Sequence, residues 1–184
     1  MLHTLHILLE RDGTKRAEYL RKNNVFKKFG KGCMVEIRVI PLYPELIAIG
    51  DNVKLASGVH FVTHDVTHSM INNTFENKNE KINEKLGCIE IGSNVFVGGY
   101  TTILSDVKIG DNVIIGAGSV VVNDIPSNSV AVGVPARVIN SYDKYLEARI
   151  NEKTYPGEMA PKAQEISREL ADWCWNQFYQ RRGN

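Results

Sequence analysis

Three features of this sequence of 184 residues predict a mainly β fold. We expect a solenoid of short parallel strands joined by tight turns. Between residues 91 and 121 an aliphatic residue returns every six positions, glycine commonly follows it, and Asn, Asp or Gly recurs three places after it. A helix would repeat its apolar face every ~3.6 residues, and a half-buried strand every ~2. A strict period of six fits neither pattern, but it is typical of a solenoid.

The repeat is most regular over residues 91–126. The aliphatic places are occupied by Ile91, Val97, Ile103, Ile109, Ile115 and Val121. Four places later stand small or β-branched residues, namely Val95, Thr101, Val107, Val113 and Ser119. The place before these holds residues that tolerate a positive φ, namely Asn94, Asp106, Asn112 and Gly118. We therefore expect one tight turn in every hexad.

Composition and charge are those of an ordinary globular protein. Apolar residues make up 43% and charged residues 23%, and the formal net charge is +1. This balance gives no reason to expect nucleic acid or an anionic membrane as a partner. The three cysteines are far apart and odd in number, which favours reduced thiols in a cytoplasmic protein. The amino-terminal sequence is a poor secretory signal and no stretch is long enough to insert into a membrane.

The amino-terminal part differs from the repeat. Residues 14–24 (TKRAEYLRKNN) predict a short helix, with a basic outer face that is either solvated or binds a partner. We expect residues 1–28 to form a separate helical segment. Residues 29–46 contain short β-rich pieces interrupted by two prolines, and they predict an irregular first coil.

A long polar segment interrupts the repeat. Regular hexads begin at residue 49, stop after His64 and Asp65, and resume at residue 91. The intervening residues 66–88 are rich in Asn, Lys and Glu and poor in aliphatic residues. We interpret them as a loop extruded from the solenoid wall, which is either functional or simply a mobile surface excursion.

After residue 121 the repeat ends and helices follow. The sequence predicts an exit turn at residues 133–135, a helix over residues 141–153, and a last helix that begins at Pro161. The apolar side of that last helix is expected to comprise Ala163, Ile166, Leu170 and Trp173. We expect this side to pack on the solenoid or on a neighbouring subunit. The domain organisation predicted is a β-helix over residues 29–139 and a helical appendage over residues 140–184.

The repeat I-G-x-N-V-x, followed by IGAGSVVVNDIPSNSVAVGVPARVI, resembles the hexapeptide-repeat acyltransferases. The maltose and galactoside O-acetyltransferases and the capsule and exopolysaccharide O-acetyltransferases are the most similar groups. The resemblance covers residues 49–139 and is most specific over residues 91–139. It implies a left-handed parallel β-helix with three hexads per coil, and a homotrimer with active sites between subunits. The handedness comes from the resemblance alone, because parallel crossovers are usually right-handed.

His64 takes the place of the family's catalytic histidine in the segment FVTHDVTH. His64 is the fourth residue of its hexad, the place that Asn52, Asn94 and Asn112 hold in other hexads. This place is a corner that points away from the interior. The long loop leaves the wall at the same corner. In the family, a histidine just before such a loop acts as general base. An imidazole with an ordinary pKa of about 6.5 can accept a proton from an attacking hydroxyl.

The resemblance also implies a site for acetyl-CoA as the acyl donor. Gly99 matches the backbone N–H that faces the histidine and stabilises the thioester oxygen. Gly99 and Ala117 match the backbone groups that bind the pantetheine arm. Arg137, after the GVPA turn, matches the basic residue that meets the phosphates, although it could instead cap the last coil. Val122 departs from the family, because the galactoside enzymes carry Thr there.

Three further residues are candidates for binding the acceptor. Glu36 lies roughly where the galactoside enzymes hold the acceptor with Asn, although it could be a plain exposed carboxylate on a strand. Asp65 either orients the ring of His64 or turns the chain. Phe96 stands where relatives carry Trp beside the reacting group, so the aromatic wall is kept but the indole N–H donor is lost.

The function expected is transfer of an acetyl group from acetyl-CoA to a hydroxyl of a sugar or glycan unit. N-acylation of an amino sugar on a nucleotide could use the same base. A β-helix without catalysis, serving as an assembly module, is an alternative from another class. His60, His64 and His68 raise a third alternative, since the γ-class carbonic anhydrases bind zinc through three histidines on this fold. Their spacing differs here, so no metal is expected.

Overall fold

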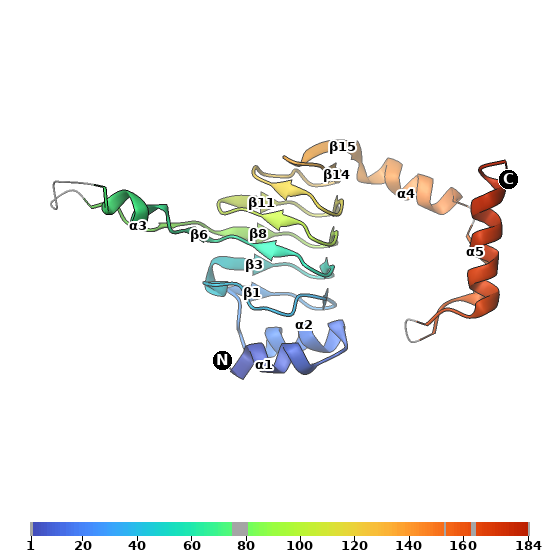
Figure 1. The fold of residues 1–184 in the computed structure, drawn as a ribbon, viewed down its shortest axis with the longest axis horizontal. Helices are drawn as coiled ribbons and strands as arrows, with labels where there is room; N and C mark the ends of the chain where they lie inside the picture. The colour runs from blue at the N-terminus through green and yellow to red at the C-terminus, as the bar shows by residue number, and fades with distance from the viewer. Residues whose placement is uncertain (1, 75–80, 153, 163–164, 184) are drawn as a thin grey trace. The chain divides into compact units, whose positions relative to one another are not determined.

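The computed structural model describes residues 2–74, 81–152, 154–162 and 165–183 (Figure 1). It contains two compact units, Met1–Tyr145 and Leu146–Asn184, which are described separately below. The division predicted from the sequence, with boundaries after residues 28 and 139, stays a prediction.

Within the described residues, three parallel sheets form the walls of the first unit. One sheet contains β1 (Lys28–Phe29), β3 (Ile47–Ile49), β8 (Ile89–Ile91) and β11 (Val107–Ile109). The second contains β2 (Met34–Val35), β4 (Lys54–Leu55), β9 (Val95–Val97), β12 (Val113–Ile115), β14 (Ser129–Val132) and the antiparallel β15 (Arg137–Ser141). The third contains β5 (His60–Phe61), β10 (Thr102–Ile103) and β13 (Val120–Val121). Since consecutive strands belong to different sheets, apart from the antiparallel pairs β6–β7 and β14–β15, the chain winds as a parallel β-helix, and the predicted fold class is confirmed.

The register between coils reproduces the hexad period. Val107 pairs with Ile89, an offset of 18 residues that corresponds to three hexads. Ile89 pairs with Ile47 at an offset of 42 residues, which is 24 more than one regular coil, because the long polar segment lies between these two strands. The break in the repeat is therefore an insertion into one coil, and the hexads on either side of it remain in phase.

Both inward-facing sets of the hexads are buried. The aliphatic residues from Ile91 to Val121 and the small residues from Val95 to Ser119 are between 0% and 2% exposed. Thr101 and Ser119 carry the polar groups of this set. Their hydroxyls donate to the carbonyl oxygen of Gly116, at 3.1 and 2.7 Å respectively, so neither leaves an unpaired donor in the core.

One corner of the helix carries a ladder of asparagines. Asn52, Asn94, Asn112 and Asn128 all have positive φ, between 54° and 59°. The side-chain amides of the first three each donate to the amide oxygen of the next asparagine in the stack, at 2.9 to 3.0 Å. Asparagine suits this corner because it tolerates the left-handed backbone and also bonds along the stack.

Glycine at the second hexad place is required by the close approach of coils. A Cβ atom added at Gly50 would lie 2.5 Å from the carbonyl oxygen of Gly92. Gly50 and Gly92 do not have positive φ, so their role differs from that of the asparagines. Strands in adjacent coils are about 4.8 Å apart, which leaves no room for a side chain between the two backbones at this turn.

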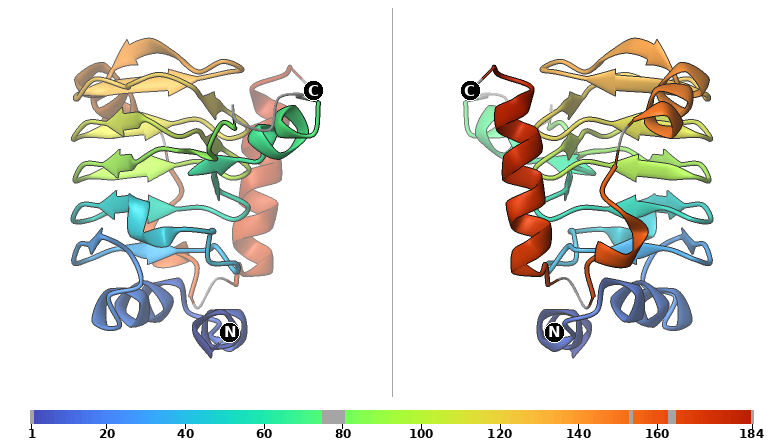
Figure 2. Two further views of the ribbon diagram at one scale, coloured as in Figure 1. Left: turned by 90° about the vertical axis from the view of Figure 1, so that its left-hand side faces the viewer. Right: turned by 90° about the vertical axis from the view of Figure 1, so that its right-hand side faces the viewer.

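Two helices close the amino-terminal end, α1 (Leu2–Leu9) and α2 (Gly13–Lys22) (Figure 2). The sequence predicted α2 within a helical segment over residues 1–28 but did not single out α1, which has no acidic residue in its first turn. Asp12 caps α2 by accepting hydrogen bonds from the N–H groups of Thr14 and Lys15, at 2.7 and 3.2 Å. These bonds hold the pKa of Asp12 below its ordinary value. Leu20 and Ala17 are buried against the first coil.

The inserted segment leaves the wall as a hairpin. β6 (His64–Asp65) runs outward and pairs antiparallel with the returning β7 (Lys85–Leu86), and α3 (Thr67–Asn72) follows β6. Figure 1 shows this segment projecting from one side of the stacked coils. The prediction of an extruded loop is thus confirmed, although its base is a paired strand.

The carboxy-terminal elements are α4 (Tyr142–Asn151), a short 3-10 turn over Gly157–Met159, and α5 (Arg168–Gln180). α4 agrees with the helix predicted over residues 141–153. The start predicted for the last helix was wrong, because Ser167 accepts a hydrogen bond from the N–H of Leu170 at 3.1 Å and caps the helix there. Ala163, expected on its apolar side, lies outside the described residues. No helix among those described is both long and apolar enough to cross a membrane.

Replacing Gly50 by Ala should destabilise the protein by about 2 kcal/mol or more, since the new methyl group meets backbone that cannot move aside. Urea unfolding would measure the change. Gly157→Ala is the control, because a Cβ atom there meets nothing within 4 Å. Equal unfolding free energies for the two variants would contradict the role given to close coil packing.

Candidate active site

His64 lies at the point where the chain leaves the wall, as the first residue of β6. It is half-buried and pairs with Leu86 of β7. The backbone of His64 differs from that of the corner asparagines, although it occupies the same place in its hexad. Asn52 and Asn94 turn the chain with positive φ, whereas His64 does not adopt that backbone, because the β6–β7 pair replaces the tight turn.

Tyr43 packs against His64 from the coil below. The two rings meet edge to face, with centroids 5.2 Å apart and planes at 81°. The hydroxyl of Tyr43 donates to the Glu84 carboxylate at 3.2 Å, and that negative charge raises the pKa of Tyr43. Tyr43 also has a left-handed φ of 55°, which is unusual for an aromatic residue. Neither Tyr43 nor Glu84 was found from the sequence, and only the proline after Tyr43 hinted at a special turn.

Nδ1 of His64 is shielded from solvent and has no hydrogen-bond partner within the described part of the chain. The carboxylate of Asp65 instead accepts from the N–H and the hydroxyl of Thr67, at 3.0 and 2.6 Å. These bonds hold the pKa of Asp65 below its ordinary value. Of the two interpretations of Asp65, the geometry supports the one in which it turns the chain into α3.

Gly99 and Ala117 lie at another corner, between the second and third sheets. The carbonyl oxygen of Gly99 accepts from the N–H of Gly118 at 2.8 Å, which ties the two coils together. In the hydrogen bonds found among described residues, the N–H groups of Gly99 and Ala117 take no part. Ala117 is exposed and Gly99 partly so. Two backbone donors in successive coils are therefore available to a ligand.

A single chain does not bring Gly99 and His64 together. The third sheet begins after the Gly99 corner and ends before the His64 corner, so the two residues flank it on opposite sides. Six residues of extended chain span one such wall, which corresponds to roughly 20 Å. The predicted base and the predicted oxyanion donor belong to separate edges of the prism.

Phe96 and Arg137 lie on the second sheet. Phe96 is on β9, in register with Lys54 and Ile114, and its side chain is 44% exposed. Phe96 is three residues before Gly99 in the chain, so it lies near the edge of the prism that contains Gly99. Arg137 begins β15, and its guanidinium donates to the carbonyl oxygen of Ala136 at 2.9 Å. No ion pair between described residues includes Arg137, so its charge is available to an anion.

Glu36 forms an ion pair with Arg16 of α2. The Arg16 side chain is completely buried, and it also donates to the carbonyl oxygens of Val35 and Glu10, at 2.8 and 2.6 Å. Arg16 therefore fastens α2 to the first coil and is not part of the basic outer face expected from the sequence. Helical phase could have revealed this, because Arg16 shares the face of Ala17 and Leu20.

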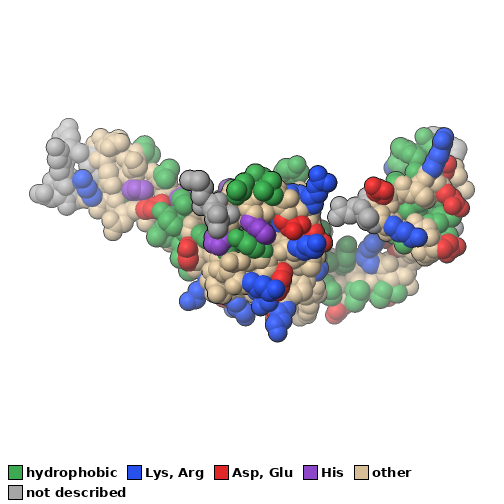
Figure 3. Space-filling view, turned by 90° about the horizontal axis from the view of Figure 1, so that it is seen from below, with side chains coloured by type: hydrophobic (Ala, Val, Ile, Leu, Met, Phe, Trp, Pro, Cys, Tyr) green, Lys and Arg blue, Asp and Glu red, His purple; other side chains and the backbone are tan. Residues whose placement is uncertain are grey.

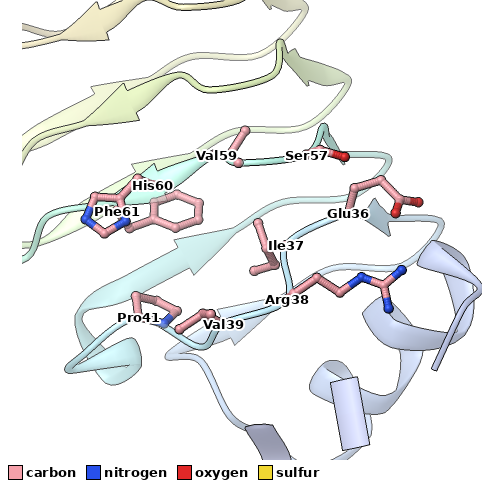
Figure 4. Close-up of a pocket in the computed structure, with 10 residues that line it drawn as sticks. Glu36, Ile37, Arg38, Val39, Pro41, Ser57, Val59, His60 and Phe61 are labelled. Atoms are coloured by element: carbon pink, nitrogen blue, oxygen red, sulfur yellow. The ribbon is translucent and has the colours of Figure 1, made fainter. Parts of the chain in front are cut away.

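A groove of about 390 Å³ opens beside the third sheet (Figure 4). Residues 36–39 and Pro41 of the first coil and residues 57–61 of the second line it. It exists because β5 is the end strand of its sheet, and the irregular first coil adds no strand below it. Figure 4 shows His60 and Phe61 at one end and Glu36 at the other.

The three clustered histidines separate in the structure. His60 is exposed on β5, His64 stands in β6, and His68 lies on α3. Within the ranges that the structure covers, no three His, Cys, Asp or Glu side chains gather as a metal site. The described part of one chain therefore does not gather these three histidines around a common point.

Comparison with known proteins agrees with this geometry. Residues 88–123 match the family model described as bacterial transferase hexapeptide (six repeats). A maltose O-acetyltransferase from Clostridium difficile 630 is 32% identical, over 76% of this chain and 82% of that one, with a TM-score of 0.55. The chain belongs to the hexapeptide-repeat acyltransferases. The β-helix of this family is left-handed, and the handedness expected from the resemblance is confirmed.

Other members are similar over different lengths. A galactoside acetyltransferase, solved in complex with coenzyme A, is 28% identical over 85% of this chain and 83% of that one, with a TM-score of 0.56. Protein CapG from Staphylococcus aureus is 42% identical over 102 residues, which are 55% of this chain and 56% of CapG. The chain thus spans about half the length of this curated relative.

Replacing Glu36 by Ala should destabilise the protein by about 3 kcal/mol, because the buried Arg16 charge would lose its counter-charge. Thermal and urea unfolding would measure the loss. Glu45→Ala is the control, since Glu45 is exposed on the 3-10 turn Pro44–Leu46. Unchanged stability with weaker acceptor binding would instead support the acceptor role predicted from the sequence.

Proposed function

We propose that this protein transfers an acetyl group from acetyl-CoA to a hydroxyl of a sugar or glycan unit, with His64 as general base. The observation that carries the proposal is the position of His64. Its ring is half-buried at the base of the extruded hairpin and is packed against Tyr43. The maltose and galactoside acetyltransferases among its relatives support the reaction class.

In the proposed reaction, the His64 imidazole removes the proton from the acceptor hydroxyl. The hydroxyl oxygen attacks the thioester carbon, and the carbon–sulfur bond then breaks. The departing thiolate takes the proton back from the imidazolium, so the base is regenerated and no covalent acyl-enzyme is needed. Such a positioned base contributes about a hundred- to ten-thousandfold in rate.

The donor groove in this proposal follows the Gly99 edge. The free N–H of Gly99 stabilises the negative charge that develops on the thioester oxygen. Ala117 offers the next backbone donor to the pantetheine arm, and Arg137 provides a positive charge for a phosphate. The exposed ring of Phe96 on β9 is an apolar wall near this edge. The acceptor candidates in this proposal are Phe96, Glu36 and Asp65, of which Glu36 also pairs with Arg16 and Asp65 also binds Thr67.

We further propose a homotrimer in the cytoplasm. A cleft between two copies would place His64 of one chain opposite Gly99 of the next, which a single chain keeps roughly 20 Å apart. The three cysteines are free thiols, in agreement with a reducing compartment.

His64→Ala should lower acetyl transfer at least about a hundredfold, because the proton acceptor is lost. Thiol release from acetyl-CoA, measured with a panel of sugars, would report the rate. The matched control is His60→Ala, four residues earlier on the exposed side of β5, which should keep most of the activity. Equal rates for wild type and His64→Ala would refute the mechanism.

Arg137→Ala should raise the KM for acetyl-CoA about tenfold with little change in kcat, since a charge-assisted contact to a phosphate is lost. Steady-state kinetics and CoA-dependent thermal stabilisation would both measure it. Lys108→Ala removes a positive charge on a different wall, where Lys108 already pairs with Glu90, and serves as the control. A fall in unfolding temperature without any change in KM would mean that Arg137 only caps the last coil.

A further inference from the structure

The charge of the chain is unevenly distributed. Residues 1–31 contain eight Lys and Arg against three Asp and Glu, whereas the remaining residues contain 14 against 18. The net charge of +1 therefore conceals a positive amino-terminal end and a negative remainder. Such an asymmetry is a recognised sign of interaction with a polyanionic partner.

Most of the positive charge at this end has no internal partner. Arg16 is used by Glu36, and Glu18 binds Arg21 and Lys22, which lowers the pKa of Glu18 to about 2. Between described residues, five other cations make no ion pair, namely Arg11, Lys15, Lys27, Lys28 and Lys31. All five are exposed. Asp51 is the acidic neighbour from the second coil, where it accepts from the N–H of Lys31 at 2.7 Å.

The same end exposes leucines. On α1, Leu5, Leu8 and Leu9 are 55%, 52% and 70% exposed, while Ile7 on the opposite side is fully buried. The exposed Arg38 of the first coil fixes the end of α1, since it donates to the carbonyl oxygens of Leu8 and Glu10, both at 3.0 Å. Figure 3, which views this end of the molecule, shows hydrophobic side chains and Lys and Arg side chains on one face.

We propose that this end, formed by α1, α2 and the turn through residues 27–31, docks on an anionic phospholipid surface. Exposed leucines on a helix beside lysines are the combination that holds amphipathic elements at a membrane interface. The leucines enter the boundary of the lipid layer, while the cations meet the lipid phosphates. Nucleic acid would use the cations but would not bury three leucines, so the lipid surface accounts for both observations.

Binding to vesicles tests the proposal. The full chain should sediment with vesicles that contain phosphatidylglycerol, but not with pure phosphatidylcholine, and high salt should release it. Lys15→Gln, Lys27→Gln and Lys28→Gln combined should weaken partitioning about a hundredfold, since each basic residue near the surface contributes roughly fivefold. Leu5→Ser, Leu8→Ser and Leu9→Ser combined should weaken it about tenfold.

Matched variants separate this end from general effects. One control set removes the same charge from other parts of the chain, with Lys144→Gln, Lys162→Gln and Arg168→Gln combined. The other removes exposed aliphatic side chains from other parts of the chain, with Ile139→Ser, Ile150→Ser and Ile166→Ser combined. Both control sets should bind vesicles like the wild type. The proposal is overturned if the wild type ignores anionic vesicles, or if a control set loses as much binding. It is also overturned if the leucine variants change only the oligomeric mass, or if RNA binds and vesicles do not.

Discussion

The structure depends on the approach of one coil to the next, at the spacing that backbone hydrogen bonds impose. Each coil must donate to its neighbour along all three walls, so every turn has to be equally compact. Gly50 and Gly92 satisfy this constraint by omitting a side chain where backbones nearly touch. The asparagine corner satisfies it by adopting positive φ and bonding amide to amide along the stack. The period of six in the sequence is a consequence of this constraint.

The candidate site arises where this constraint is released. At His64 the chain leaves the wall, pairs with its own return through Leu86, and resumes the next coil in register. A corner that would otherwise be a tight turn thereby becomes a short strand carrying an imidazole. Tyr43 and Glu84, which are 41 residues apart, meet at the base of this hairpin, and the Tyr43 ring packs against that imidazole. The regular wall supplies the rigid support that a catalytic group needs.

The sequence predicted the fold and its interruption well, because both depend on local periodicity. The sequence was less informative about which partner a polar side chain takes. Arg16 belongs to a basic run, yet it is buried, because Glu36 and two carbonyl oxygens of other segments satisfy it. The sequence left two roles open for Asp65, and the hydrogen bonds from Thr67 to its carboxylate favour the one in which it turns the chain. The start of α5 was misplaced because Ser167 provides a stronger cap than the proline before it.

By itself, the sequence determined the coil, its inward-facing residues and the place of the inserted hairpin, since each is a matter of phase within six residues. The candidate base was predicted from the resemblance to the family. Only the tertiary structure decided which side chains surround His64, that Gly99 lies on a different edge from it, and that Glu36 is tied to Arg16. It also showed that the cations and leucines of the amino-terminal end share one face. These are contacts between coils and helices far apart in the chain, and no local period encodes them.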